Sequence, residues 1–214
     1  MEAFRDSLLR SSADLIEKAR KHPFVTQTAA GTIPDERFRR WVAQDYLWIR
    51  EFERFLAMLA ARAPREIRRP FFEDVLNIHG EIELLEEMSA RMGIDLLQAR
   101  MTFICHAYTE FLLATGALRS FELCLAVCYA AAFIYLDGWS YAKKTQAKSG
   151  KWHEFIDFWS GEGFRHWVDA IARAVDAVAE KSTPAVLEQM KEMFQVTVRY
   201  ELRFWDMAFE DTDW

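Results

Sequence analysis

Hydrophobic and polar positions in this chain recur with the three-to-four-residue period of an α-helix. The clearest case lies between residues 38 and 55, where six positions share one helical face: Phe38, Trp41, Asp45, Trp48, Phe52 and Phe55. Five of these side chains are aromatic and the sixth is a carboxylate. Burying an ionised carboxylate among rings is costly unless a neighbour hydrogen-bonds it. Asp45 is therefore either a core residue bonded by a tyrosine, arginine or backbone N–H, or an acid that faces a ligand.

The same period continues along most of the chain and is interrupted by proline, glycine and polar turns. We predict helices over residues 3–20, 32–64, 67–92, 95–113, 120–142, 153–159, 161–179 and 183–209. In the third of these, the side chains expected to face inward are Phe71, Phe72, Val75, Ile78, Ile82, Leu85 and Met88. No stretch alternates with the period of a strand. The expected fold is all-α: a single domain over residues 1–214, built as a bundle of seven to eight helices.

The last predicted helix carries a second acid within an apolar face. That face consists of Phe194, Thr197, Val198, Glu201, Phe204 and Trp205. Burial raises the pKa of a carboxyl towards the range where it both donates and accepts a proton. Each acid could simply pair with a buried arginine or tyrosine and do no chemistry. Two such acids on two helices nevertheless favour a shared pocket.

Composition narrows the classes of function. The net charge is −6, and no basic stripe with interleaved aromatic residues is present, which argues against nucleic-acid binding. Three cysteines without a CxxC pair indicate reduced thiols, as in a cytoplasmic protein. The most apolar run, residues 123–136, is 14 residues long and too short to span a bilayer. We interpret it as a buried central helix and expect no membrane partner.

Histidine and cysteine give little support to a metal or thiol site. His79 and Glu83 are four residues apart, but the paired Glu-x-x-His motifs of di-iron bundles are missing. We expect a solvated pair there and no metal. Cys128 shares a helical face with Ala131 and Tyr135, and these small residues leave room for a neighbouring helix or for a ligand. A buried free cysteine is ordinarily a small hydrophobic residue, so a catalytic thiol is the less favoured interpretation.

Four segments of the chain resemble the TenA/thiaminase II family. They are FRRWVAQDYLWIREF (38–52), AYTEFLL (107–113), WSGEGF (159–164) and YELRFWDMAF (200–209), in the family's order. The likeness begins near His22-Pro23 and continues to the C-terminus. It implies a haem-oxygenase-like helical fold, usually in a homotetramer, that needs no cofactor. It also implies hydrolysis of thiamin or of its breakdown products, with release of hydroxymethylpyrimidine.

The resemblance further implies roles for individual residues. Asp45 matches the acid that hydrogen-bonds the aminopyrimidine, and Glu201 matches the catalytic glutamate that shuttles protons. Tyr108 and Tyr135 match tyrosines of the catalytic pocket. By position alone, Tyr108 is equally compatible with plain core.

Aromatic residues complete the expected pocket. Trp48 and Trp159 stand where many family members have tyrosine, although Trp159 could also be plain core, and Phe204 lies beside the catalytic glutamate. A flat aminopyrimidine suits aromatic walls, and its amidine-like edge offers a donor and an acceptor that a carboxylate can meet.

One departure from the family pattern concerns the nucleophile. Many members carry a cysteine four residues before the tyrosine that matches Tyr135, and here that position is Ala131. The chain resembles the branch without this cysteine, which is associated with amino- or formylamino-pyrimidine hydrolysis. That branch often has a glutamate at the next position, where Ala132 stands. Either Cys128, one turn earlier, joins the substrate-binding site as a replacement nucleophile, or water attacks with Glu201 as acid or base.

The expected function is hydrolysis of a small thiamin-related aminopyrimidine in thiamin salvage. Two alternatives stay open: a protein that binds a pyrimidine without turnover, and a haem-oxygenase-like oxidative enzyme of the pyrroloquinoline quinone type.

Overall fold

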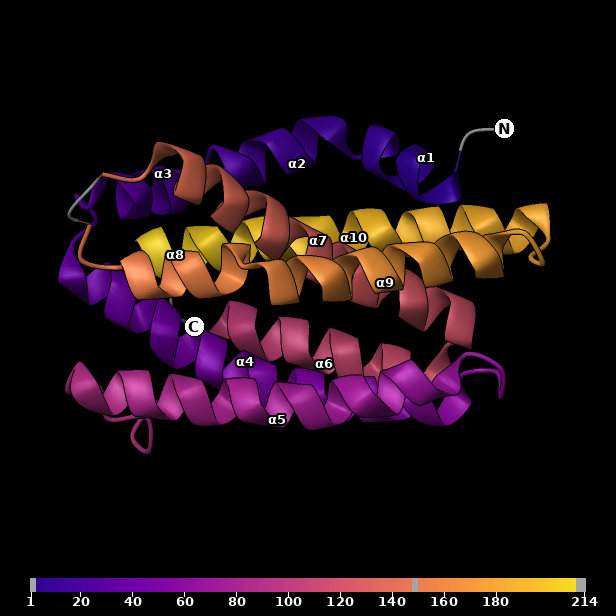
Figure 1. The fold of residues 1–214 in the computed structure, drawn as a ribbon, viewed down its shortest axis with the longest axis horizontal. Coiled ribbons are helices and arrows are strands. Elements are labelled where there is room, and N and C mark those ends of the chain that lie inside the picture. The colour runs from indigo at the N-terminus through magenta and orange to yellow at the C-terminus, as the bar shows by residue number, and fades with distance from the viewer. Residues whose placement is uncertain (1–2, 148–149, 211–214) are drawn as a thin grey trace.

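The computed structural model of the protein describes residues 3–147 and 150–210. Within these ranges it consists of ten helices and contains no strand (Figure 1). The helices are α1 (Phe4–Ser11), α2 (Ala13–Arg20), α3 (Pro23–Ala30), α4 (Asp35–Arg62), α5 (Arg68–Arg91), α6 (Phe103–Leu118), α7 (Phe121–Thr145), α8 (His153–Ser160), α9 (Glu162–Ala179) and α10 (Pro184–Glu210). The all-α class predicted from the hydrophobic period is confirmed.

The N-terminal segment is divided more finely than predicted, which raises the helix count above seven to eight. Ser12, with φ −119° and ψ 12°, leaves helical geometry and separates α1 from α2. Pro23 begins α3 instead of only ending the helix before it. Proline is tolerated there because its fixed φ suits the first turn and no intrahelical hydrogen bond needs its missing N–H.

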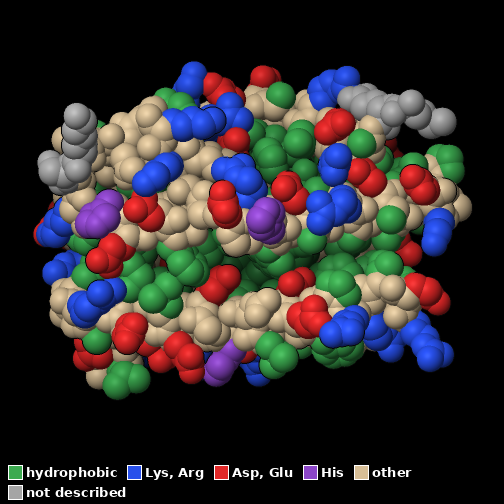
Figure 2. All heavy atoms as spheres, viewed as in Figure 1, with side chains coloured by type: hydrophobic (Ala, Val, Ile, Leu, Met, Phe, Trp, Pro, Cys, Tyr) green, Lys and Arg blue, Asp and Glu red, His purple; other side chains and the backbone are tan. Residues whose placement is uncertain are grey.

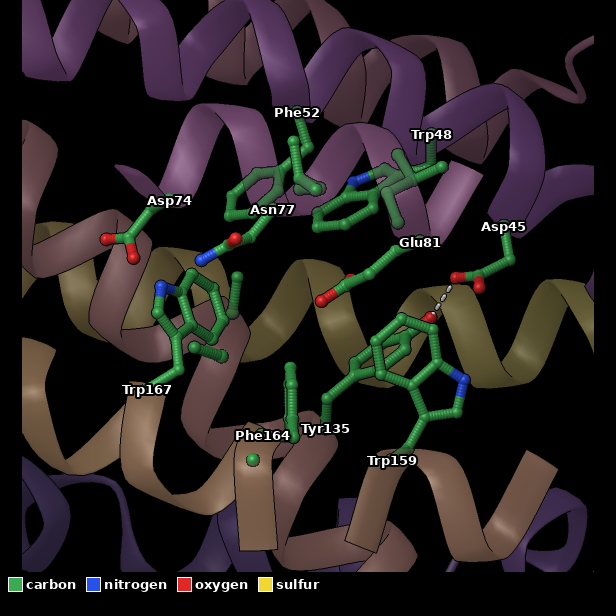
Figure 3. A pocket seen from close by; sticks show the side chains of 15 residues that line it. Asp45, Trp48, Phe52, Asp74, Asn77, Glu81, Tyr135, Trp159, Phe164 and Trp167 are labelled. Atoms are coloured by element: carbon green, nitrogen blue, oxygen red, sulfur yellow. Dashed lines mark hydrogen bonds between the residues drawn. The ribbon is translucent and has the colours of Figure 1, made fainter. Parts of the chain in front are cut away.

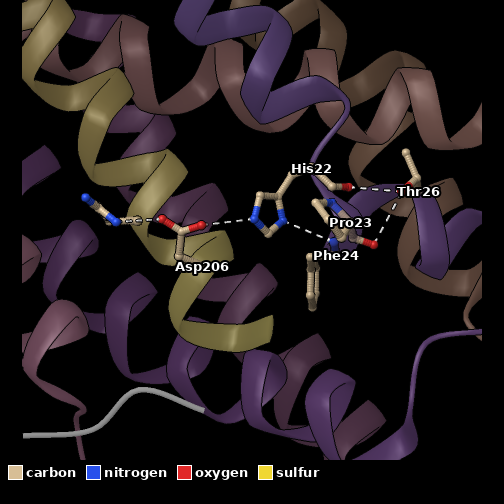
Figure 4. A network of polar contacts seen from close by, with 6 residues as sticks. His22, Pro23, Phe24, Thr26 and Asp206 are labelled. Atoms are coloured by element: carbon tan, nitrogen blue, oxygen red, sulfur yellow. Dashed lines mark hydrogen bonds and ion pairs between the residues drawn. The ribbon is translucent and has the colours of Figure 1, made fainter. Parts of the chain in front are cut away.

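His22 ties this N-terminal segment to the last helix (Figure 4). Its Nδ1 accepts a hydrogen bond from the Phe24 backbone N–H at 3.1 Å and so caps α3. Because Nδ1 accepts, the ring proton is assigned to Nε2, which donates to Asp206 Oδ1 on α10 at 3.1 Å. Burial lowers the pKa of His22, against the opposing effect of Asp206. The neutral imidazole therefore joins two parts of the fold that are far apart in sequence.

Helix α6 begins eight residues later than predicted. Asp95 Oδ1 accepts from the Leu97 backbone N–H at 3.0 Å, but this bond closes a turn and no helix follows. The helix begins instead after Thr102, whose hydroxyl accepts from the Cys105 backbone N–H. The Thr102 N–H donates to the Gln44 side chain at 2.9 Å. A residue on α4 therefore holds the capping residue in place.

Helix α7 runs through the centre of the molecule and packs against α10, α9, α8 and α3. It contains the predicted apolar run 123–136, and nearly all residues of that run are buried. By length and composition the whole 25-residue helix would suffice to cross a membrane, but 83% of its apolar window is buried inside the fold. The prediction of a buried central helix is confirmed.

Helix α5 lies at one edge of the molecule and packs mainly on α4 (Figure 1). Five of its seven expected inward residues are buried: Phe71, Ile78, Ile82, Leu85 and Met88. Val75 is partly buried. The prediction for Phe72 is wrong, because its side chain is 48% exposed. A helix with few neighbours has only a narrow covered stripe, and Phe72 falls outside it.

Candidate functional site

A cavity of about 250 Å³ lies among α4, α5, α7, α8 and α9 (Figure 3). Its aromatic walls are Trp48, Phe52, Tyr135, Trp159, Phe164 and Trp167. Its polar side chains are Asp45, Asp74, Asn77 and Glu81. An outer hollow shares Asn77, Glu81, Gly163 and Phe164 with it, so the cavity continues outwards between α5 and α9. Figure 2 shows hydrophobic side chains in the furrow between α5 and α9.

Asp45 is both a buried residue bonded by a tyrosine and an acid that lines a cavity, the two interpretations that its spacing left open. It is 1% exposed, and its Oδ1 accepts a hydrogen bond from the Tyr135 hydroxyl. Its Oδ2 has no hydrogen-bond partner in the described part of the chain, yet the residue lines the cavity. Burial raises the pKa of Asp45 to about 7, and the bond from Tyr135 opposes that rise. The free oxygen is an acceptor, or when protonated a donor, available to a ligand.

Trp48 and Trp159 form two sides of the wall around Tyr135. The Trp48 and Tyr135 rings are nearly parallel, at 9° and 6.2 Å between centroids. The Trp159 ring stands edge-on to Tyr135, at 84° and 5.6 Å. Both indole N–H groups are buried and lack a hydrogen-bond partner among the described residues. The structure thus brings together four of the predicted site residues, since Asp45 lines the same cavity.

Glu201 lies outside the lining of the cavity, one layer behind it. It is 1% exposed, and its Oε1 accepts from the Tyr108 hydroxyl at 2.5 Å. Burial raises the pKa of Glu201 to about 8; the Tyr108 hydrogen bond opposes this rise, and the charge of Asp45 adds to it. The prediction that both acids face one cavity therefore holds for Asp45 but not for Glu201 in this arrangement.

The remaining predicted site residues support this second layer. Tyr108 packs against the cavity-lining Trp48, with 5.4 Å between ring centroids. Phe204 stands edge-on to Tyr108 at 6.5 Å. Neither residue lines the cavity, and nor does Cys128, which is 1% exposed. Burial first, and then the charges of Asp74 and Cys124, raise the pKa of the Cys128 thiol well above its ordinary range.

The position that the resemblance matches to the family cysteine opens directly on the cavity. Ala131 and Ala132 both belong to the cavity lining, and neither side chain carries a nucleophile. A thiol reacts as its thiolate, and Cys128 is a turn away with a raised pKa. Its surroundings therefore do not favour a catalytic thiol.

Three polar residues of α5 were missed as site residues. Asp74, Asn77 and Glu81 all line the cavity and follow the three- and four-residue spacing of one helical face. Burial raises the pKa of Glu81 to about 8, with further rises from Asp45 and Asp74. Burial likewise raises the pKa of Asp74 to about 6. Their spacing was the available signal, but a polar stripe beside an apolar one is typical of a solvated helix face.

His79 lies on the exposed side of α5, away from this cavity. Its Nδ1 is 3.3 Å from Glu53, and its Nε2 is 4.0 Å from Glu83. In residues 3–147 and 150–210, no group of three or more His, Cys, Asp or Glu side chains is placed to hold a metal ion.

Known proteins agree with this fold over nearly its whole length. The sequence matches the TENA/THI-4/PQQC family over residues 10–211. It is 29% identical over 204 residues to an aminopyrimidine aminohydrolase of Helicobacter pylori, covering 88% of this chain and 90% of that protein. It is 25% identical over 221 residues to an aminopyrimidine aminohydrolase of Bacillus subtilis (strain 168), covering 99% and 92%.

A solved structure of a TenA homologue from Pyrococcus furiosus superposes on the chain with a TM-score of 0.93. The two are 28% identical, and the match covers 96% of this chain and 100% of the other. The haem-oxygenase-like all-α fold is therefore confirmed. The chain belongs to the TENA/THI-4/PQQC family.

Proposed function

We propose that this protein hydrolyses a thiamin-related aminopyrimidine, replacing an amino-bearing group with a hydroxyl from water. The observation that carries the proposal is Asp45, a buried carboxylate with one unpaired oxygen at an aromatic-walled cavity. Relatives named as aminopyrimidine aminohydrolases support the class of substrate.

Asp45 is suited to recognise the edge of an aminopyrimidine. A ring nitrogen beside an exocyclic amino group presents one acceptor and one donor on the same edge. A carboxyl group with a pKa near 7 meets both when it carries a proton, since one oxygen accepts and the other donates. Tyr135 holds one oxygen of Asp45 and so fixes the direction of the second. Trp48 and Trp159 supply faces against which a flat ring packs.

Glu201 and Tyr108 form the second proton-transfer pair of the proposal. Their short hydrogen bond lies behind Trp48, and the pKa of Glu201 near 8 keeps a proton available at neutral pH. Phe204 stands edge-on to Tyr108, and the burial of both Tyr108 and Glu201 keeps bulk water from that bond. Cys128 acts in packing alone.

A second candidate is a protein that binds the pyrimidine without turnover. The observation that favours it is the alanine pair at the cavity wall, Ala131 and Ala132, where the resemblance would place a nucleophile.

Incubation with thiamin, aminopyrimidine and formylaminopyrimidine, followed by mass-spectrometric detection of products, separates the two candidates. Release of hydroxymethylpyrimidine from any of them supports hydrolysis. Binding of hydroxymethylpyrimidine in calorimetry without product from any substrate supports the second candidate.

Asp45→Asn provides the matched test of recognition. The amide keeps the shape but cannot change between donor and acceptor, so affinity for hydroxymethylpyrimidine should fall by about tenfold or more, the scale of one lost buried hydrogen bond. Asp14→Asn, the same change at an exposed position on α2, should leave affinity unchanged. Equal affinity of both variants would count against the assignment of Asp45.

A further inference from the structure

Helix α5 places a third acid inside the cavity. In Figure 3 the Glu81 side chain extends between Asp74 and Asp45. Glu81 belongs to the lining of both the cavity and its outer hollow, so it lies where a ligand would pass and where a water molecule would enter.

The surroundings of Glu81 give it no structural partner. No hydrogen bond or ion pair to its side chain is formed by residues 3–147 and 150–210. The charged groups that act on it are two further acids, Asp45 from α4 and Asp74 from α5. The cavity lining contains no lysine, arginine or histidine among the described residues. A half-buried acid beside two others destabilises the fold, which is typical of a residue retained for function.

We propose that Glu81 is a catalytic residue of this hydrolysis, accepting a proton from the attacking water and passing it to the leaving nitrogen. This inference rests on the function proposed above and names the group that activates water in the absence of a nucleophile at Ala131 and Ala132.

The step balances with water alone. A C–O bond forms between the water oxygen and the substrate carbon that carries the amino group. The C–N bond breaks, and its electron pair goes to nitrogen. The ionised Glu81 carboxylate takes one proton from the water and then gives it to the departing nitrogen. Water is consumed, ammonia leaves, the hydroxyl product remains, and Glu81 returns to its starting form.

Other groups fit this task less well. Both oxygens of Asp45 are assigned to the pyrimidine edge, and one of them also accepts the Tyr135 hydrogen bond. Glu201 lies outside the lining and is bonded to Tyr108. The pKa of Glu81 near 8 places both of its protonation states within reach at neutral pH, as an acid–base catalyst requires.

The test compares Glu81→Gln with Glu83→Gln in the full chain. Glu83 lies on the same helix with an exposed side chain, so the same substitution there serves as the control. We expect Glu81→Gln to lower kcat by about 100-fold or more, as loss of a general acid–base group does. Affinity for hydroxymethylpyrimidine should stay within about threefold of the wild-type value, which is less than one lost hydrogen bond to a charged group would cause. Glu83→Gln should change neither quantity.

Two further measurements separate catalysis from a structural effect. The kcat/KM of the wild type should follow a bell-shaped pH profile, because Glu81 must be ionised as the base whereas Asp45 must keep its proton to bind the pyrimidine edge, and Glu81→Gln should lose the rising limb of that profile. Glu81→Ala opens space for a small carboxylate. If the substitution removes proton transfer, added formate should raise the kcat of Glu81→Ala by about tenfold or more.

Wild-type kcat in Glu81→Gln, or failure of formate to restore Glu81→Ala, would overturn the role of Glu81 while leaving the hydrolase intact. Absence of turnover by the wild type on all three substrates would overturn both proposals.

Discussion

Asp45 and Glu201 are buried and Glu81 is half-buried, and all three have few of the hydrogen bonds that would offset their burial. Asp45 and Glu201 each accept one tyrosine hydroxyl, and Glu81 accepts none from the described residues. Burial is the largest cause of the raised pKa in all three. Burying an acid in this way costs stability, and proteins typically retain such acids where protons must move near neutral pH. The three acids together therefore indicate a reactive site.

Stability should fall as pH rises from about 6.5 to 8. Glu81 and Glu201 ionise near 4.5 when unfolded but near 8 when folded, so the folded state binds more protons in this window and loses stability as pH rises. His22 has a lowered pKa and acts in the opposite sense, but only below about 6.5. Thermal unfolding of the ligand-free protein at pH 6.5, 7.25 and 8 should show a falling Tm. A smaller slope is expected in Glu201→Gln. A Tm that rises over this window would contradict the raised pKa values.

The identity of the nucleophile is decided by two single substitutions. Cys128→Ser should leave kcat within about threefold, because the thiol lies outside the cavity lining and burial keeps it protonated. Glu201→Gln should lower kcat by about 100-fold or more, because it removes a proton-transfer group. Steady-state rates with an aminopyrimidine substrate measure both. Loss of activity in Cys128→Ser with Glu201→Gln still active would assign the nucleophile to the thiol.

At the scale of helices, the cavity lies beside the contact between α4 and α5, and both helices contribute side chains to its lining. α4 packs on α5, α6 and α10, whereas α5 packs mainly on α4. The α4–α6 contact is close: a Cβ on Gly116 of α6 would lie 2.8 Å from Met58 Sδ and 3.2 Å from the Phe55 ring. This close approach positions Tyr108, also on α6, behind Trp48.

Gly116→Ala should therefore destabilise the protein by about 1–2 kcal/mol, the usual cost of adding a methyl group to a packed contact. The Met58 side chain is flexible and can move, but the Phe55 ring is fully buried and packs against Phe52. Gly80→Ala on α5, where nothing lies within 4 Å of the new Cβ, should instead stabilise by about 0.5–1 kcal/mol through helix propensity. Urea unfolding of both variants measures the difference. If both variants had the same increase in the free energy of unfolding, the α4–α6 contact would tolerate the methyl group.

At the scale of the molecule, large hydrophobic side chains stay exposed on the edge helix α5. Phe72 is 48% exposed and Leu76 is 75% exposed, and the two lie one helical turn apart. Their exposure supports the predicted assembly of chains, which remains a proposal, because an apolar face of this kind is typical of a subunit contact.

We expect a homotetramer of the 25.1 kDa chain in light scattering at micromolar concentration. Leu76→Glu should lower the measured mass if α5 contributes to the contact, because a charge would be buried there without a partner. A wild-type mass equal to one chain would contradict the prediction. An unchanged mass in Leu76→Glu would place the contact elsewhere.

The sequence alone determined the helices and the two apolar faces that carry Asp45 and Glu201, because a 3.6-residue period specifies which side chains share a face. It also identified Trp48, Tyr135 and Trp159, which the structure places around one cavity with Asp45. These features are local, or follow from family motifs that span single helices. Cytoplasmic location and catalytic roles stay predictions.

Only the tertiary structure decided which face of each helix borders the cavity. Glu81 belongs to a polar stripe that the period assigns to solvent, yet packing beside α9 encloses it. The face of α10 that carries Glu201 is as apolar as the face of α4 that carries Asp45. Glu201 nevertheless lies outside the cavity lining, where its carboxylate accepts a hydrogen bond from Tyr108. Likewise Thr102, and not Asp95, begins α6 because Gln44 from another helix binds it. In each case the deciding contact comes from a residue distant in sequence, and helical periodicity describes only residues within a few turns of each other.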